Sequence, residues 1–287
     1  MADRVTFRGK LQGGLLPVIG VANALTARIV EDVGFEAGYV SGAGIANTYL
    51  GVPDIGLVTM SELVQHVDAI TDRVSIPLAV DADTGFGNPI NVMRTVAALE
   101  RAGAQAIQLE DQEFPKRCGH FPSKQVIPTV EMVQKIRAAV AARTDPDTMI
   151  IARTDALASL GFDEAIERAR RYVDAGADMT FVEAPTSVDQ LEKIPRLIDA
   201  PQVVNLVIGG KTPVLPFEEL QELGFSVALY ANLSLQGAML GTQRALSALR
   251  ESGSLEEAYG DIVDWQERQR LVGLADYEQL EFEFGVS

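Results

Sequence analysis

The stretches EDVGFEAGYVSG (31–42), ERAGAQAIQLED (100–111), VDAGADMTFVEA (173–184) and QELGFSVALYA (221–231) decide the fold of this chain. Each of them reads as the last turn of a helix, a glycine that ends it, and a short apolar strand with little polar alternation. Strands of this kind are covered on both faces, which is typical of parallel sheets. The four stretches therefore predict a repeated helix–strand unit.

Four further apolar runs of the same kind lie between these stretches. Together the two sets predict eight strands, which is the number that closes a parallel barrel. The additional runs are LPVIGV (16–21), IPLAVDAD (76–83), MIIARTD (149–155) and QVVNLV (202–207).

The gaps between the strands carry apolar residues at three- and four-residue spacing, which predicts helices. Regular alternation of strand and helix favours a parallel sheet with right-handed crossovers, and eight such units fit a (β/α)8 TIM barrel better than an open doubly wound sheet. The predicted helices are 60–72, 89–102, 130–142, 163–175, 187–198 and 234–250, and their predicted N-caps include Thr59, Asn88, Thr129 and Ser187.

A dinucleotide-binding fold is the alternative that the sequence argues against. The segment GAGIAN (42–47) starts like the glycine fingerprint of such folds. It lacks the third glycine, and no acidic strand end follows at the required distance of roughly twenty residues. We therefore expect no nucleotide site there.

Residues 1–287 are predicted to form one barrel domain, because no linker or low-complexity segment marks a second. Residues 255–287 form a polar tail with scattered leucine and aromatic residues. This pattern predicts extra C-terminal helices whose apolar side must pack on another surface, such as that of a neighbouring subunit.

The composition excludes several classes of protein. The chain is 47% hydrophobic, with a net charge of −16 and a single cysteine. A negative charge disfavours nucleic acid and anionic membrane surfaces, since both are bound through clustered lysine and arginine. No signal sequence opens the chain, and no uncharged stretch is apolar enough to span a bilayer. We therefore expect a cytoplasmic protein that binds neither nucleic acid nor a membrane.

Nearly every predicted strand ends in a polar or charged residue. In a TIM barrel the carboxyl ends of the strands converge on one open mouth, where active sites lie. The pattern therefore predicts a single active site at that mouth. The residues are Ser41, Asp81, Asp83, Glu110, Arg153, Glu183 and Asn205.

Three of these strand ends predict a metal site. Asp81 and Asp83 are two positions apart, so on an extended strand both side chains point to the same face. Carboxylates held together are costly unless a cation lies between them, and carboxylate oxygens with water suit Mg²⁺. A single such aspartate could instead cap the next helix, but Glu110 on the adjoining strand joins the pair. We expect Mg²⁺ here, with Mn²⁺ as a substitute.

The segment KRCGH (116–120) holds the only cysteine and one of the two histidines among cations. This setting favours the thiolate and proton transfer, which predicts catalytic roles for Cys118, His120 and Lys116. A lone cysteine can also be a small buried hydrophobic residue, and Lys116 and Arg117 can be solvated charges. Arg153 ends an apolar strand and needs an anion, either Glu183 or a substrate carboxylate.

At these residues the chain resembles the isocitrate lyase and phosphoenolpyruvate mutase superfamily over most of its length. Its Lys-Arg-Cys-Gly-His loop resembles the signature of the lyase branch, which holds isocitrate, methylisocitrate and alkylmalate lyases, such as 2,3-dimethylmalate lyase, and oxaloacetate hydrolases. The matching segments are YVSGAG (39–44), GVPDIG (51–56), VDADTGFG (80–87), LEDQ (109–112), KRCGH (116–120), ARTDA (152–156) and VEAP (182–185).

The resemblance implies a role for each site residue. The implied metal-positioning residues, acting partly through waters, are Asp54, Asp81, Asp83 and Glu110. The implied substrate-binding residues are Ser41, Gly42, Ala43, Gly119, Glu183 and Asn205. The implied catalytic residues are Cys118, Lys116, Arg153 and His120. The resemblance also implies a homotetramer in which terminal helices cross to a neighbouring subunit.

The implied reaction cleaves a 2-hydroxydicarboxylate, of the 2-alkylmalate or methylisocitrate type, to a 2-oxo acid such as pyruvate and a second carboxylate. Cleavage leaves a carbanion beside a carboxylate, an aci-acid, which Mg²⁺ and nearby cations would stabilise and Cys118 would protonate. The substrate is therefore a small anionic di- or tricarboxylate. The alternatives are an oxaloacetate hydrolase or decarboxylase and a phosphonomutase of the carboxyphosphonoenolpyruvate type.

Two departures from the superfamily pattern bear on the substrate. The segment NLVIGGKTP (205–213) differs from that of isocitrate and methylisocitrate lyases and looks more like the alkylmalate lyase branch. Gln236 stands near the start of the last barrel helix, where those lyases place an arginine. The loss of that charge argues against a third substrate carboxylate.

Overall fold

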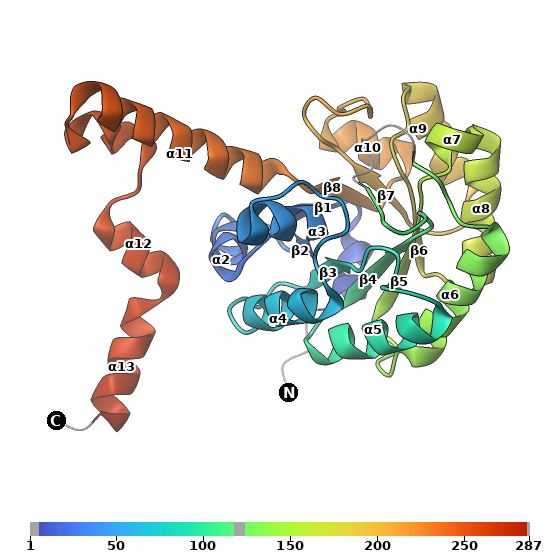
Figure 1. Cartoon of the computed structure of the whole chain (residues 1–287), viewed down its shortest axis with the longest axis horizontal. Coiled ribbons are helices and arrows are strands. Elements are labelled where there is room, and N and C mark those ends of the chain that lie inside the picture. Colours follow the sequence, from blue (N-terminus) through green and yellow to red (C-terminus); the bar gives the residue numbers. More distant parts are fainter. Residues whose placement is uncertain (1–5, 118–123, 286–287) are drawn as a thin grey trace.

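The computed structural model describes residues 6–117 and 124–285. Eight parallel strands form a closed barrel in which each strand pairs with its sequence neighbours and the last pairs with the first (Figure 1). The predicted TIM barrel and all eight predicted strands are confirmed. The strands are β1 (Leu16–Val21), β2 (Gly38–Val40), β3 (Leu78–Asp81), β4 (Ala106–Glu110), β5 (Met149–Thr154), β6 (Met179–Val182), β7 (Gln202–Asn205) and β8 (Val227–Tyr230).

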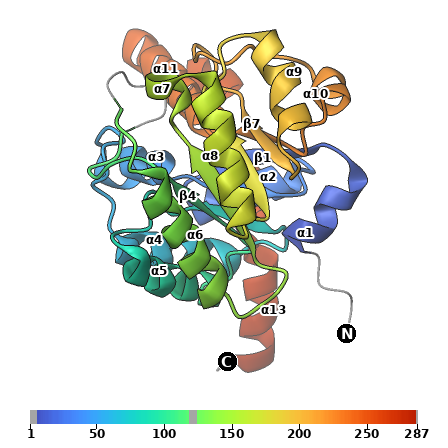
Figure 2. The same cartoon turned by 90° about the vertical axis from the view of Figure 1, so that its right-hand side faces the viewer.

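Helices surround the barrel and connect successive strands. The main ones are α2 (Ala24–Asp32), α4 (Met60–Thr71), α5 (Pro89–Arg101), α6 (Thr129–Ala142), α8 (Phe162–Asp174), α9 (Val188–Leu197) and α10 (Phe217–Leu223). Helices α6 and α8 lie at the front of the view in Figure 2. Shorter helical segments are α1 (Phe7–Lys10), η1 (Leu11–Gly13), α3 (Gly42–Ile45), η2 (Ala46–Leu50) and α7 (Leu157–Leu160).

Three of the four predicted N-caps are confirmed. The side chains of Thr59, Asn88 and Ser187 accept hydrogen bonds from backbone N–H groups in the first turns of α4, α5 and α9. The prediction for Thr129 is wrong. Pro128 takes the cap position of α6 without a side-chain cap hydrogen bond, because its ψ of 138° keeps it outside the helix, and Thr129 is the first helical residue.

The core has an inner and an outer layer. Inside the barrel, apolar side chains from the strands pack against Phe7 of α1, which is 1% exposed. Between strands and helices, two further clusters pack the outward-facing strand residues against the helices. Apolar side chains therefore fill the interior of the barrel, and only the mouth at the carboxyl ends of the strands leaves space for an active site.

The C-terminal part leaves the barrel. Helix α11 (Leu233–Ser252) extends away from it in Figure 1, and the tail continues through η3 (Leu255–Asp261), α12 (Trp265–Val272) and α13 (Leu274–Phe284). Arg270 of α12 pairs with Asp32 of α2 at 2.6 Å and 2.7 Å. Apolar side chains remain exposed along this part, including Leu246, Leu255, Trp265, Phe282 and Phe284.

No helix of the described residues is long and apolar enough to cross a membrane.

Candidate active site

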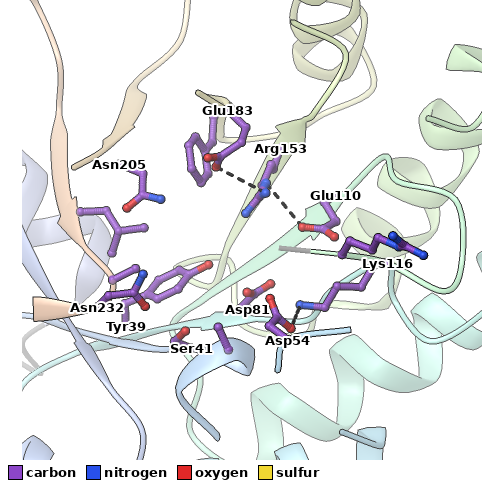
Figure 3. Close-up of a pocket in the computed structure, with 15 residues that line it drawn as sticks. Tyr39, Ser41, Asp54, Asp81, Glu110, Lys116, Arg153, Glu183, Asn205 and Asn232 are labelled. Carbon is purple, nitrogen blue, oxygen red and sulfur yellow. Dashed lines mark hydrogen bonds and ion pairs between the residues drawn. The ribbon is translucent and has the colours of Figure 1, made fainter. Parts of the chain in front are cut away.

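A pocket opens at the carboxyl ends of the strands and is lined by side chains from almost every strand (Figure 3). Nine of the residues predicted for the site line it: Ser41, Ala43, Asp54, Asp81, Glu110, Lys116, Arg153, Glu183 and Asn205. The residues are far apart in sequence, so the barrel closure brings them together.

Two further predicted residues lie just behind this pocket. A methyl group built on Gly42 would lie 3.1 Å from Asp83 Oδ1 and 3.8 Å from Asp81 Oδ2. The absence of a side chain at Gly42 therefore lets α3 approach the two aspartates closely. Asp83 itself contacts the pocket residue Lys116 rather than lining the pocket directly.

The predicted geometry of the aspartate pair is wrong in one respect. The strand β3 ends at Asp81, and Asp83 adopts a left-handed conformation with φ of 49°. Its backbone N–H donates to Asp81 Oδ1 at 3.1 Å. The chain turns here instead of continuing as a strand, so the two carboxylates come close through a turn and not through the two-residue repeat of a strand.

Lys116 is a buried cation and not a solvated charge. Its side chain is 4% exposed, and Nζ lies 2.6 Å from Asp54 Oδ1 and 2.8 Å from Asp83 Oδ1. Burial opposes the charge of Lys116, but Asp83, Asp81 and Glu110 hold its pKa well above the usual value. Lys116 is therefore an ammonium ion at neutral pH.

The carboxylates around Lys116 outnumber it. Burial raises the pKa of Asp83 to about 7, even though Lys116 lowers it, and burial likewise raises the pKa of Glu110. One oxygen of Glu110 is buried and accepts no hydrogen bond within the described chain. When these carboxylates are ionised, Lys116 does not balance their negative charge, and an additional cation would do so.

Arg153 faces three carboxylates. Its nitrogens lie 3.4 Å from Glu110 and 3.4 Å from Glu183, and it makes two shorter hydrogen bonds to Asp155 at 2.9 Å and 3.0 Å. The sequence predicted Glu183 or a substrate carboxylate as its partner and missed Asp155. The guanidinium also lies over the Phe181 ring, 5.2 Å from its centroid.

Tyr39, Phe181, Leu229, Ala231 and Asn232 also line the pocket and were not predicted, and Arg117 of the KRCGH segment completes the lining. Tyr39 is 5% exposed, and burial raises the pKa of its phenol well above the usual value, so it carries a proton. Asn232 lies two residues after Tyr230, the last residue of the strand β8, and is the N-cap of α11. The strand-end rule that identified the other residues applies to Asn232 as well and could have found it.

Cys118, Gly119 and His120 lie outside the described residues. The residues just before them are fixed by paired hydrogen bonds between Gln112 and the backbone of Arg117, at 2.9 Å and 2.8 Å. The catalytic and substrate-binding roles of the three residues therefore stay predictions.

The acidic residues fit a divalent cation that keeps part of its water. Among the described residues, no three histidine, cysteine, aspartate or glutamate side chains are close enough together to enclose an ion by themselves. The carboxylates of Asp54, Asp81, Asp83 and Glu110 nonetheless all lie near the Lys116 ammonium. Oxygen donors with few direct contacts suit Mg²⁺, which dehydrates reluctantly.

The wall opposite Lys116 carries no charge in the described chain beyond Glu183 and Arg153. Asn205, Asn232 and Leu229 line it. Gln236 is exposed on α11 and does not line the pocket. On this wall the pocket therefore offers the amide groups of Asn205 and Asn232, and the position that lacks the arginine lies outside the lining.

Comparisons with known proteins agree with this geometry. The family described as phosphoenolpyruvate phosphomutase matches residues 10–250. The chain is 40% identical over 267 residues to 2,3-dimethylmalate lyase of Eubacterium barkeri, covering 93% of this chain and 92% of that protein. It is 43% identical over 264 residues to 2-methylisocitrate lyase of Aeropyrum pernix, covering 92% and 85%.

Solved structures show the same relationship. Oxaloacetate acetylhydrolase in complex with 3,3-difluorooxalacetate superposes with a TM-score of 0.92 at 34% identity, covering 98% of this chain and 97% of that one. Phosphonopyruvate hydrolase in complex with oxalate and Mg²⁺ gives 0.87 at 32% identity, covering 96% and 97%. These matches confirm the resemblance inferred from the motifs: the chain belongs to the phosphoenolpyruvate mutase and isocitrate lyase superfamily.

Proposed function

We propose that this protein is a carbon–carbon lyase that requires Mg²⁺, with Mn²⁺ as a substitute, and cleaves a 2-alkylmalate or a related 2-hydroxydicarboxylate to a 2-oxo acid and a second carboxylate. The observation that carries the proposal is the pocket in which the buried carboxylates Asp81 and Glu110 face the buried cations Lys116 and Arg153. The names of the relatives, dimethylmalate and methylisocitrate lyases, support the same reaction class.

Asp54, Asp81, Asp83 and Glu110 would hold the metal ion. When bound, Mg²⁺ supplies Lewis acidity that favours loss of the substrate hydroxyl proton. The remaining chemistry belongs to the chain. Arg153 binds a substrate carboxylate through its guanidinium, and Lys116 provides positive charge where the carbanion develops. Cys118 delivers the proton to carbon, as the sequence predicts.

The neutral wall limits the substrate. A tricarboxylate such as methylisocitrate places a further negative charge in the pocket, whose described cations are Lys116, Arg117 and Arg153. On the wall opposite Lys116, no described cation other than Arg153 would meet that charge. Asn205 and Asn232 offer neutral amides instead. This arrangement favours a dicarboxylate of the alkylmalate type over a tricarboxylate, because burying an uncompensated carboxylate is costly.

Oxaloacetate hydrolysis is the second candidate. The structural similarity to oxaloacetate acetylhydrolase favours it, and the same cations would hold the carboxylates of oxaloacetate. The two reactions differ in their products, since the hydrolase releases oxalate and acetate and the lyase releases a 2-oxo acid.

Nuclear magnetic resonance separates these readings in one experiment. The protein with Mg²⁺ is incubated with 2-alkylmalates, methylisocitrate, isocitrate, oxaloacetate and phosphonopyruvate, and the products are identified. A 2-oxo acid with a second carboxylate from an alkylmalate supports the lyase. Oxalate from oxaloacetate alone would replace it with the hydrolase, and turnover of phosphonopyruvate alone would replace it with a phosphonate enzyme.

The proposal extends to the assembly of the protein and to its location in the cell. We propose that residues 1–287 form one domain in a cytoplasmic homotetramer, in which residues 255–287 and α11 contact neighbouring subunits. The exposed apolar side chains along α11 and the tail, such as Leu246, Leu255 and Phe282, support this, because contiguous apolar surface marks an interface.

A further inference from the structure

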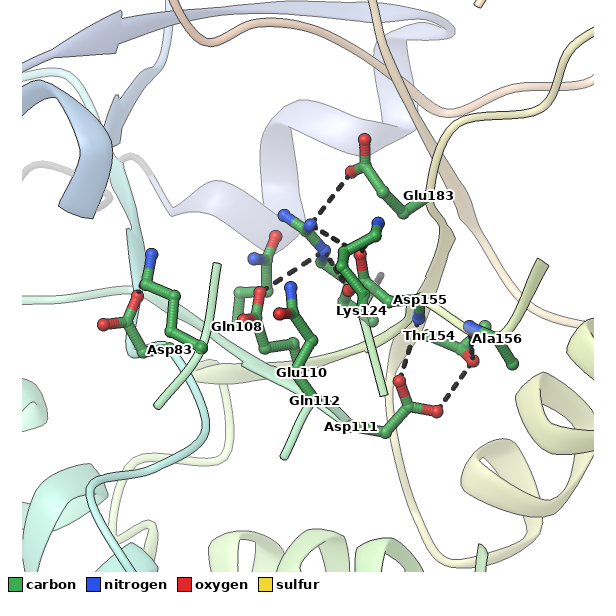
Figure 4. A network of polar contacts seen from close by, with 12 residues as sticks. Asp83, Gln108, Glu110, Asp111, Gln112, Lys124, Thr154, Asp155, Ala156 and Glu183 are labelled. Carbon is green, nitrogen blue, oxygen red and sulfur yellow. Dashed lines mark hydrogen bonds and ion pairs between the residues drawn. The ribbon is translucent and has the colours of Figure 1, made fainter. Parts of the chain in front are cut away.

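The Asp155 carboxylate lies between two buried cations (Figure 4). Arg153 donates from Nε to Oδ2 at 2.9 Å and from Nη2 to Oδ1 at 3.0 Å, and Lys124 donates from Nζ to Oδ1 at 2.5 Å. The side chains of Asp155 and Lys124 are 0% and 1% exposed. One carboxylate therefore holds both cations where water cannot replace it.

Asp155 is itself held by a second buried acid. Its backbone N–H donates to Asp111 Oδ1 at 2.8 Å. Asp111 also accepts hydrogen bonds from Thr154 at 2.7 Å, from Tyr172 at 2.8 Å and from Arg168 at 3.2 Å. Because Arg168 and Tyr172 belong to α8, this network ties Asp155 to the helix behind the strand β5 and limits its movement.

This arrangement sets the orientation of Arg153. Asp155 occupies the Nε–Nη2 edge of the guanidinium, and Phe181 lies beneath its plane. A two-point contact in the plane and a ring below it fix a planar group in all directions. Glu110 and Glu183 contact the same arginine at 3.4 Å. Of the three acids, Asp155 makes the two shortest contacts and leaves Nη1 for a ligand in the pocket.

The contact between Lys124 and Asp155 has a second effect, on the position of the chain near Lys124. It is the first described residue after the segment 118–123. Before that segment, Lys116 is bound to Asp54 and Asp83. The Lys124–Asp155 contact therefore fixes the first described residue after that segment through the same carboxylate that holds Arg153.

We propose that Asp155 is a positioning residue, which orients Arg153 toward the substrate carboxylate and anchors Lys124, without touching the substrate itself. The inference rests on the proposed function, in which Arg153 binds an anion. Burial alone would raise the pKa of Asp155, but Arg153 and Lys124 lower it to about 2, so the carboxylate stays charged at working pH.

The test replaces Asp155 with asparagine. The amide has the shape of the carboxylate, but in either orientation its NH₂ group faces a nitrogen of Arg153, so the two-point contact with Nε and Nη2 is lost. In Asp155→Asn we expect the dissociation constant of oxalate, measured by calorimetry with Mg²⁺ present, to rise about tenfold to a hundredfold, with a matching rise in KM. Oxalate affinity and KM equal to those of the unchanged protein would overturn the inference.

The charge-matched double variant Lys124→Met/Asp155→Asn guards against failure to fold. It removes one positive and one negative charge together, so no cation is left without a counter-charge. We expect it to fold and still to bind oxalate at least about tenfold more weakly, because one amide oxygen cannot hold both Nε and Nη2. Affinity equal to that of the unchanged protein would overturn the inference as well.

Asp178→Asn is the matched control. Asp178 also bridges two arginines, Arg8 and Arg143, but it precedes β6 at the opposite end of the barrel. It should lower the melting temperature without changing oxalate affinity; an equal loss of affinity would show a general effect on stability and overturn the assignment of positioning to Asp155. Because oxalate binding needs no turnover, failure of the proposed lyase reaction and failure of this inference are read separately.

Discussion

The Lys116 ammonium lies 2.6 Å from an oxygen of Asp54, although the two residues are 62 positions apart in the chain. The pair sits beside Asp81, Asp83 and Glu110, so a lysine provides positive charge at the place where the acidic residues would hold a metal ion. Charges at such distances interact by roughly a few kcal/mol under protein conditions. Lys116 and the proposed metal ion would therefore act on the same carboxylates.

Lys116→Met should bind Mg²⁺ more tightly and turn over more slowly. Removing the ammonium leaves the carboxylates more negative, so we expect the dissociation constant for Mg²⁺, measured by calorimetry, to fall by about tenfold. Turnover should fall because the cation at the developing carbanion is lost. Lys193→Met, which removes an exposed lysine paired with Asp189, is the control. Weaker Mg²⁺ binding in Lys116→Met would contradict the electrostatic argument.

Asp81→Asn should reduce turnover by about a hundredfold or more, because the carboxylate at the end of β3 is a predicted metal ligand. Chelation by EDTA should have the same effect and should be reversed by added Mg²⁺. Asp189→Asn, an exposed acid, is the control. Full activity of the unchanged protein in metal-free buffer would disprove the metal requirement.

Cys118→Ser tests the acid that the sequence predicts. A serine hydroxyl has a much higher pKa than a thiol, so lyase turnover should fall by about a hundredfold to ten-thousandfold while Mg²⁺ binding stays unchanged. Oxaloacetate hydrolysis need not use this proton, so rates on both substrates are compared. A serine variant with full lyase activity would leave the reaction without its proposed acid.

Gly20→Ala should destabilise the barrel, because a methyl group there would lie 1.8 Å from the backbone oxygen of Ala231. Overpacking against backbone costs typically about 1–3 kcal/mol, and this contact is with an atom that cannot rotate away. Gly13→Ala is the matched control, since nothing lies within 4 Å of the added methyl group. Urea unfolding measures both, and equal stability of the two variants would contradict the packing described.

Deleting the residues after Gly253 should yield aggregated or lower-order particles in light scattering. The deletion removes Trp265, Phe282 and Phe284, which are exposed on one chain and need cover in an assembly. Phe282→Ser, a change at a side chain that is 87% exposed, should weaken assembly without disturbing the barrel. An unchanged number of subunits per particle after the deletion would exclude a role of the tail in assembly.

The sequence alone determined the architecture. Eight apolar strands alternate with amphipathic helices, and this periodicity is local information that survives without any knowledge of contacts. The predicted strand boundaries placed polar residues at the carboxyl ends of the strands. The structure brings three of them, Asp81, Glu110 and Asn205, to one pocket as predicted. The helix caps at Thr59 and Asn88 followed from local chemistry in the same way.

The tertiary structure decided the partners of the charged groups. Asp155 is two residues from Arg153, and nothing in that spacing shows that its carboxylate also binds Lys124 or that it lies closer to Arg153 than Glu183 does. The left-handed turn at Asp83 likewise follows from the fit between β3, α3 and Lys116. Periodicity reports which side of an element is buried, whereas an ion pair depends on the approach of side chains from distant elements, and only the closed barrel sets those distances.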